Sequence, residues 1–159
     1  MRPLVSALAL AALASVPATG GPSLATYANS RFGYTVEYPA DLLVPQEEAE
    51  NGDGRAFEAR HGRAQILVYG GYNALNESPA ELAGRAETDC AGHHAQYRVA
   101  KPNLVAISCT TTDGILYQKT MIRGDTLTTL RAAYPSSERK VWDGVVARMS
   151  RSLVPAPGG

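Results

Sequence analysis

The segment RFGYTVEYP, residues 31–39, alternates large apolar residues with glycine or polar residues. Its large apolar residues are Phe32, Tyr34, Val36 and Tyr38. Because side chains of an extended chain point alternately to opposite faces, this spacing predicts a strand with one apolar face. Pro39 has no backbone N–H to donate to a neighbouring strand, so we expect the strand to end there.

Two further strands are predicted at residues 55–60 and 64–70, joined by a tight turn through His61. An acidic loop lies between the apolar triplet 42–44 and the first of these strands, and its Asn-Gly and Asp-Gly pairs suit a chain reversal. In the second strand, positions 66–69 are all large and apolar, so both faces of the strand are apolar. We therefore expect it to be a central strand that is covered on both sides.

A helix is predicted from Ser78 to Gly92. Ser78 and Glu81 have the spacing of a capping box, and Pro79 takes the first helical position, where its missing N–H costs nothing. One stripe of this helix is apolar and contains Leu82, Ala83, Ala86 and Cys90. Gly92 suits the end of the helix, because glycine readily adopts the left-handed conformation found there.

The rest of the chain predicts a meander and a closing helix. Four β-rich segments are separated by turn residues and cover 95–101, 104–111, 114–122 and 126–135. Residues 136–153 then place apolar side chains at three- and four-residue spacings, which is typical of an amphipathic helix docked on a sheet. These side chains are Val141, Trp142, Val145, Val146, Met149 and Leu153. The order of elements predicts an α+β domain, an antiparallel β-sheet flanked by helices.

The N-terminus has the features of an export signal. Arg2 precedes an apolar run at 4–13, and small residues provide two processing points, after Ala18 or, as we prefer, after Ala25. We expect a signal peptide at 1–25, a single domain at 26–153 and a disordered, proline-rich tail at 154–159. The run is shorter than the ~20 residues of a membrane helix, so we expect an exported, periplasmic or secreted protein with no membrane span after cleavage.

The charge of the chain is balanced. Arg2 is the only charged residue of 1–25, so its removal leaves 14 of the 15 basic residues against 15 acidic ones. Nucleic-acid affinity is largely electrostatic and needs a basic face. The composition therefore argues against a nucleic-acid partner.

Several motifs together resemble a known group of proteins. They are FGYTVEYP, NGDGR, AQILVYGGYN, LYQKT and the closing segment YPSSERKVWDGVVARMSRSL. They resemble exported bacterial proteins with a PsbP-like α/β sandwich domain, and the resemblance spans about residues 27 to 153. PsbP-like domains serve as binding and assembly factors and share no set of catalytic residues. The resemblance therefore implies a non-catalytic binding or assembly module, without a cofactor and with a protein or small-molecule partner that it does not identify.

The two cysteines predict a disulfide. Exported proteins meet oxidising conditions, where two cysteines pair intramolecularly in only one way. Cys90 lies on the apolar stripe of the first helix, and Cys109 shares a strand face with Val105 and Ile107, so the sulfurs can meet between helix and sheet. Two free thiols, or a zinc site that adds His93 and His94, are the alternatives.

A small secreted hydrolase is the alternative function. The histidines, His61, His93 and His94, are the candidate general bases, yet no GxSxG nucleophile motif is present, and we expect no catalytic set. The segment VYGGYN instead combines aromatic residues with flexible glycines and an amide, which suits a recognition loop. Tyr69, Tyr72 and Asn73 are therefore the expected binding residues, although both tyrosines would equally suit packing at a sheet edge.

Overall fold

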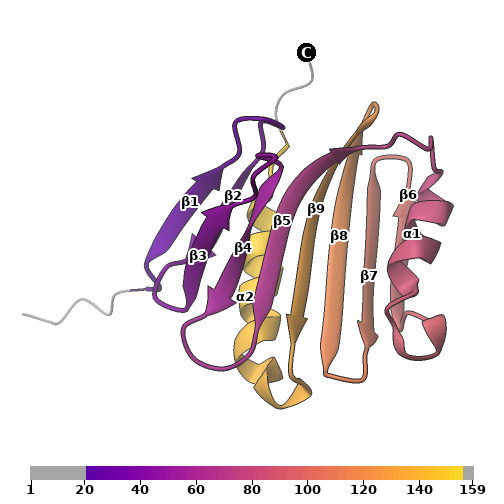
Figure 1. The fold of residues 1–159 in the computed structure, drawn as a ribbon. Helices are drawn as coiled ribbons and strands as arrows, with labels where there is room; N and C mark the ends of the chain where they lie inside the picture. Colours follow the sequence, from indigo (N-terminus) through magenta and orange to yellow (C-terminus); the bar gives the residue numbers. More distant parts are fainter. Residues whose placement is uncertain (1–20, 156–159) are drawn as a thin grey trace, which may run out of the picture.

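A computed structural model describes residues 21–155 of the chain. Within this range seven strands form one antiparallel sheet, in the order β3-β4-β5-β9-β8-β7-β6 (Figure 1). The strands are β3 (Leu43–Glu48), β4 (Gly54–Ala59), β5 (Gln65–Tyr72), β6 (Tyr97–Lys101), β7 (Leu104–Thr110), β8 (Ile115–Arg123) and β9 (Thr126–Tyr134). A second, two-stranded sheet pairs β1 (Leu24–Ala28) with β2 (Thr35–Pro39).

Two helices cover opposite faces of the large sheet. Helix α1 (Pro79–Glu87) packs on β6 and β7, and α2 (Arg139–Ser152) packs on β9 and β2. Short 3-10 turns at Ala91–His93 and Ser136–Glu138 accompany them. Figure 1 shows that α2 lies behind the β4–β5–β9 half of the sheet, whereas α1 lies beside the β6–β7 end. Each helix therefore covers only part of its face.

The topology confirms the expected order of strands. Strands β6 to β9 form a meander in which each pairs with the next. Strands β4 and β5 form the predicted hairpin, and β5 pairs along its whole length with β9, from Gln65↔Ala133 to Tyr72↔Thr126. Strand β5 is thus central, as the apolar character of both its faces predicts.

Each helix buries its apolar stripe in a separate hydrophobic cluster. The larger cluster lies between the sheet, α2 and the β1–β2 pair, and includes Tyr34, Val36, Phe57, Ile66, Leu130, Trp142 and Met149. The smaller cluster lies under α1 and includes Leu82, Ala83, Val105, Ile107 and Leu116. In the larger cluster, the hydroxyl of buried Tyr34 donates to the backbone oxygens of Asp53 and Val68, each at 3.0 Å, so the ring is fully buried without leaving its polar atom unpaired.

Three local expectations are corrected. Part of the expected acidic loop is strand β3, which continues to Glu48 and pairs with β4 across a bulge. Helix α1 ends at Glu87, before Gly92, because the chain tightens there into bonds to the third residue back, from the Thr88 N–H to the Arg85 carbonyl (3.3 Å) and from the Cys90 N–H to the Glu87 carbonyl (2.9 Å). Val141 is 50% exposed and does not belong to the buried stripe of α2.

The ends of the described region bear on the expected boundaries. Most of the expected signal peptide, residues 1–20, lies outside the described residues. Ala25 lies inside β1, where it pairs with Tyr38, so cleavage after it would shorten that strand; the processing point after Ala18 would leave the strand intact. In the expected tail, Val154 exchanges two backbone hydrogen bonds of 2.9 Å with Thr35, and residues 156–159 lie outside the described residues.

The two cysteines lie at disulfide-bond distance, as the sequence predicts. The sulfur atoms of Cys90 and Cys109 are 2.00 Å apart and the Cα atoms 5.7 Å apart. Both residues are buried in the smaller cluster. The bond ties the segment that follows α1 to β7, and it occupies both sulfurs that a zinc site would need as thiolates.

Replacing Trp142 with alanine tests whether α2 holds the larger cluster together. The indole is 3% exposed and its Nε1 donates to Glu138 Oε2 at 2.9 Å. We expect Trp142→Ala to lower the free energy of unfolding by about 3–5 kcal/mol in chemical denaturation. The neighbouring exposed Val141→Ala should change it by less than about 0.5 kcal/mol. A loss below about 1 kcal/mol for Trp142→Ala would contradict the packing described above.

Removing the disulfide should also destabilise the domain. The bond closes a loop with a sequence separation of 19, which corresponds to about 3 kcal/mol of unfolding free energy through restriction of the unfolded chain. We expect Cys90→Ala/Cys109→Ala to lose stability of that order. Thiol titration of the exported, denatured and unreduced wild-type protein should detect no thiol, and detection of two would refute the bond.

Candidate functional site

A groove lies on the α1 face of the sheet, where the helix leaves β8, β9 and β5 uncovered. It has a volume of about 520 Å³. Its lining includes Tyr69, Gly71, Arg85, Gln118, Thr129 and Arg131. This volume falls within the range of small-ligand sites, roughly 300–1,000 Å³. We call it the α1 groove.

Strand pairing accounts for the chemistry of the groove. Gln118 pairs with Arg131, and Thr120 pairs with Thr129, so these polar residues form two cross-strand rows on β8 and β9. The second row continues on β5, where Tyr69 pairs with Thr129. Because alternate residues of a strand share a face, all of these side chains lie on the α1 side of the sheet.

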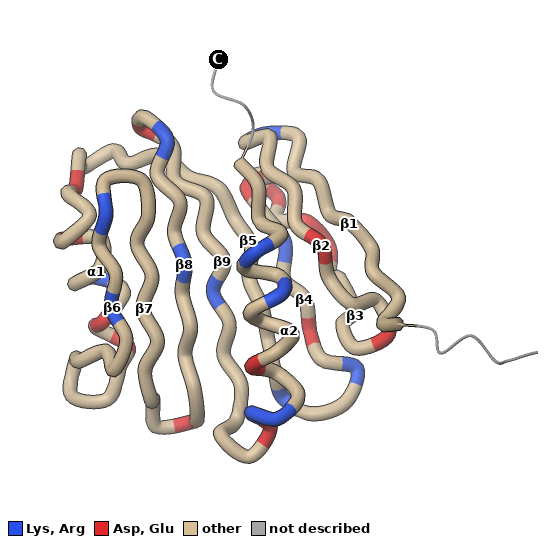
Figure 2. The backbone as a smooth tube through the Cα atoms, turned by 180° about the vertical axis from the view of Figure 1, so that it is seen from behind, with Lys and Arg blue, Asp and Glu red and all other residues tan. Residues whose placement is uncertain are grey.

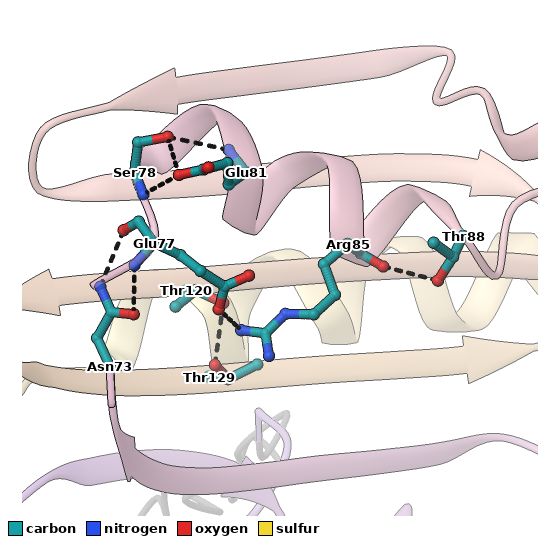
Figure 3. A network of polar contacts seen from close by, with 8 residues as sticks. All are labelled: Asn73, Glu77, Ser78, Glu81, Arg85, Thr88, Thr120 and Thr129. Atoms are coloured by element: carbon teal, nitrogen blue, oxygen red, sulfur yellow. Dashed lines mark hydrogen bonds and ion pairs between the residues drawn. The ribbon is translucent and has the colours of Figure 1, made fainter. Parts of the chain in front are cut away.

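The floor of the groove contains a buried pair of hydroxyl groups. Thr120 and Thr129 are each 4% exposed, and their Oγ1 atoms are 2.9 Å apart (Figure 3). One hydroxyl donates to the other, and either one can be the donor. Gly71 lies at the end of the same face, and a Cβ built there would meet no atom within 4 Å. The floor is therefore polar and has open space beside it.

Two ion pairs hold the walls of the groove. Arg131 donates to Asp89 Oδ2 at 2.8 Å and to Gln118 Oε1 at 3.1 Å. Arg85 of α1 pairs with Glu77 Oε2 at 2.7 Å. Each guanidinium group forms an ion pair with a carboxylate. The groove therefore offers hydrogen-bond donors and acceptors to a ligand but carries little net charge. Such a surface suits a polar ligand without a large charge of its own.

A hydrogen-bonded turn fixes the start of α1 beside the groove (Figure 3). Asn73 donates from Nδ2 to the Glu77 carbonyl and accepts from the Glu77 N–H, both at 2.9 Å. Ser78 and Glu81 form the predicted capping box. The hydrogen bonds from Ser78 to Glu81 lower the pKa of the Glu81 carboxyl group, because they stabilise its charged form.

The structure places Tyr69 and Tyr72 at the border of the α1 groove, but not Asn73. Tyr69 lines the α1 groove and is 36% exposed. Tyr72 lies three positions later on the same strand, so its side chain points to the other face, where it contacts the Phe32 ring (centroids 5.3 Å apart) and stays 60% exposed. The Asn73 amide group is used by Glu77. Of the expected loop, Tyr69 is therefore the member whose side chain faces the groove.

The three histidines are exposed and lie away from the groove lining. His61 is in the bend between β4 and β5. His93 has its Nδ1 2.7 Å from the Thr88 carbonyl oxygen, a backbone partner rather than a hydroxyl or a thiol. In the described part of the chain, no group of three or more His, Cys, Asp or Glu side chains is arranged to hold a metal ion.

Sequence reasoning missed the polar floor of the groove. Gln118 and Thr120 on β8, and Thr129 and Arg131 on β9, each occupy alternate positions of a predicted strand. That spacing indicates one polar face on each strand. The register that aligns the two polar faces depends on the β8–β9 pairing, which the spacing within either strand alone does not specify.

No protein-family model and no curated protein matches this chain. Among solved structures, the chain is similar to cyanobacterial PsbP (CyanoP) from Synechocystis sp. PCC 6803, with a TM-score of 0.61 at 12% sequence identity. The similarity covers 90% of this chain and 98% of that one. The likeness shows the fold, a PsbP-like α+β sandwich, and so confirms the expected fold class.

Among residues 21–155, no helix is long and apolar enough to cross a bilayer.

The hydroxyl pair in the floor gives a test of the groove's structure. Thr129→Val leaves the buried Thr120 hydroxyl without its partner, so we expect a loss of about 1–3 kcal/mol in the free energy of unfolding. Thr120→Val/Thr129→Val removes both polar groups and should cost less than the sum of the single variants. Strictly additive losses in urea denaturation would mean that the two hydroxyls do not interact.

Proposed function

We propose that this chain is an exported, non-catalytic binding module and that its ligand binds in the α1 groove. The observation that carries this proposal is the combination of an exposed aromatic ring, Tyr69, with a satisfied polar floor and two walls held by ion pairs. Pre-organised polar groups around an aromatic surface are typical of binding sites, because little conformational entropy is lost when the ligand binds.

Export is part of the proposal. The features of the N-terminus and the pairing of Cys90 with Cys109 both support an oxidising compartment, the periplasm or the exterior. Because Ala25 belongs to β1, we propose processing after Ala18, which leaves the β1–β2 sheet complete.

Two observations support a binding function over the alternative, a hydrolase. Both cysteines are engaged with each other, so neither is available as a nucleophile. The ring contact of His93 is to a backbone oxygen, whereas a serine hydrolase needs its histidine within hydrogen-bond reach of the nucleophile. The similarity to a PsbP structure agrees with a binding module but concerns the fold alone.

Replacing Tyr69 should weaken ligand capture and leave the fold intact. We expect Tyr69→Ala to reduce, by about tenfold or more, the amount of partner recovered by the immobilised processed protein from periplasmic extract. Tyr97→Ala is the matched control. Tyr97 on β6 is 52% exposed and pairs with Ser108, so its side chain lies on the face of the sheet opposite to the α1 groove. Thermal unfolding verifies that both variants are folded. Equal capture by both variants would refute the α1 groove as the site.

A further inference from the structure

A second groove lies on the other face of the sheet, between α2 and strands β7 and β8. It has a volume of about 560 Å³. In Figure 2 this face is seen directly, with α2 in front of β9 and β5, while β6, β7 and β8 have no helix in front of them. We call it the α2 groove. The sheet separates it from the α1 groove, so the two surfaces can act independently.

The α2 groove has an apolar floor. Ile115 and Tyr117 contribute from β8, and Val146 and Ala147 contribute from α2. Three of these side chains are half-buried, and Val146 is buried. The Tyr117 hydroxyl is 2.8 Å from the Ser150 hydroxyl, so the polar end of the ring is already satisfied. The ring and the aliphatic groups therefore offer surface for the apolar body of a ligand.

The two ends of the groove differ in charge. At one end, Arg139 pairs with Asp143 (3.3 Å), so the charges of the two side chains compensate each other. Asp143 also accepts a hydrogen bond from the Tyr134 hydroxyl (2.7 Å). At the other end Arg151 lines the groove, and no carboxylate of the described residues lies within ion-pair distance of it. The groove is thus neutral at one end and cationic at the other.

Lys119 adds a second positive charge on the same face of the sheet, beside the last turn of α2. Its Nζ donates to the Ser150 carbonyl at 2.6 Å, and among the described residues it has no carboxylate partner. Burial lowers the pKa of this lysine, because its charged form is poorly solvated there. An anion bound nearby would stabilise the charged form of Lys119, which the protein itself leaves without a counter-ion.

The C-terminus of α2 does not oppose an anion at this end. Unpaired carbonyls at a helix C-terminus repel negative charge. Here the Ser150 carbonyl accepts from Lys119, and the Met149 carbonyl accepts from the Leu153 N–H (3.1 Å) and the Ser152 hydroxyl (2.9 Å). Two carbonyls of the last turn of α2, those of Met149 and Ser150, are therefore already paired, which weakens this repulsion.

We propose that the α2 groove binds an amphiphilic carboxylate, with its carboxylate at Arg151 and its aliphatic or aromatic body along Ile115, Val146 and Ala147. Arginine suits this role because its guanidinium group makes paired hydrogen bonds to a carboxylate. The volume of the groove matches a small molecule rather than a macromolecular surface. This ligand is distinct from the polar ligand of the α1 groove.

Three ligands with the same ten-carbon chain but different head-group charges distinguish the contribution of the negative charge to binding from that of the apolar chain. Decanoate, decanol and decyltrimethylammonium are titrated into the processed full-length domain by calorimetry, below their aggregation concentrations. We expect decanoate to bind with a dissociation constant below about 1 mM, and decanol at least about tenfold more weakly. The cation should not bind. Equal binding of decanoate and decanol would refute the anion site, and failure of decanoate to bind would refute the whole proposal.

Charge variants locate the carboxylate. Arg151→Gln should weaken decanoate binding by about tenfold, the effect of losing one charge-assisted contact, whereas Arg151→Lys should retain part of the affinity. Arg148→Gln is the matched control, because Arg148 is an exposed cation of the same helix that does not line the groove. Equal losses for the glutamine variants at 151 and 148 would mean nonspecific electrostatic attraction and would overturn the proposal.

Methyl NMR spectra locate the apolar body. Decanoate should shift the methyl signals of Ile115, Val146 and Ala147 and leave that of Leu127, in the α1 groove, unchanged. Shifts at Leu127 alone would place the ligand in the other groove and refute the assignment. The Tyr69→Ala variant should bind decanoate like wild type, because Tyr69 does not line the α2 groove. The proposal for the α1 groove and the proposal for the α2 groove can therefore fail independently.

Discussion

The large sheet is wider than the helix that covers each of its faces, and both grooves follow from this constraint. Neighbouring strands lie about 4.8 Å apart, so seven strands span roughly 29 Å between the outermost two. A helix with its side chains is about 10 Å across and covers two or three strands. Helix α2 lies over the β9 side with β1–β2 beside it, whereas α1 lies over β6 and β7. The α1 face is therefore without a helix from β8 across β9 and β5 to β3, and the α2 face is without one over β6 to β8 (Figures 1 and 2).

Strand β8 lies under both grooves and gives each face a different chemistry. Gln118 and Thr120 line the α1 groove, whereas Tyr117 lines the α2 groove and Lys119 lies on the same face as Tyr117. Because side chains alternate between the two faces of a strand, β8 alone can contribute polar residues to the α1 groove and apolar or cationic residues to the opposite face. The β5–β9 pairing then places Tyr69 beside the polar floor, although β5 and β9 are far apart in the sequence. The two proposed sites thus share strands β8 and β9 but no side chain.

The features that the sequence predicted well depend on local spacing. The capping box of α1 needs only Ser78 and Glu81, so it was predictable. The alternation before Pro39 predicted β2, but the strand begins at Thr35 and not at Arg31, because residues 31–32 form a turn and Gly33 has a positive φ. The disulfide needed one further step, the packing of the first helix on the strand face of Cys109, and it forms although Cys90 lies in the bend after α1 and not on the helix itself. The grooves were not predictable, because they depend on how far each helix extends across the sheet. Tyr72 and Asn73 suited a recognition loop by composition, but strand alternation and the Glu77 backbone determine where their side chains lie.

The near-zero net charge of the chain conceals a local separation of charges. Lys119 on β8 and Arg151 on α2 lie on the α2 side of the sheet, without carboxylate partners among the described residues. A polyanion needs a continuous track of such cations, because its affinity grows with the number of phosphates neutralised. On this face Arg139 is paired with Asp143, so its charge is compensated. The remaining cations suit one anionic group beside the aliphatic side chains of the α2 groove better than the repeated phosphates of a polyanion.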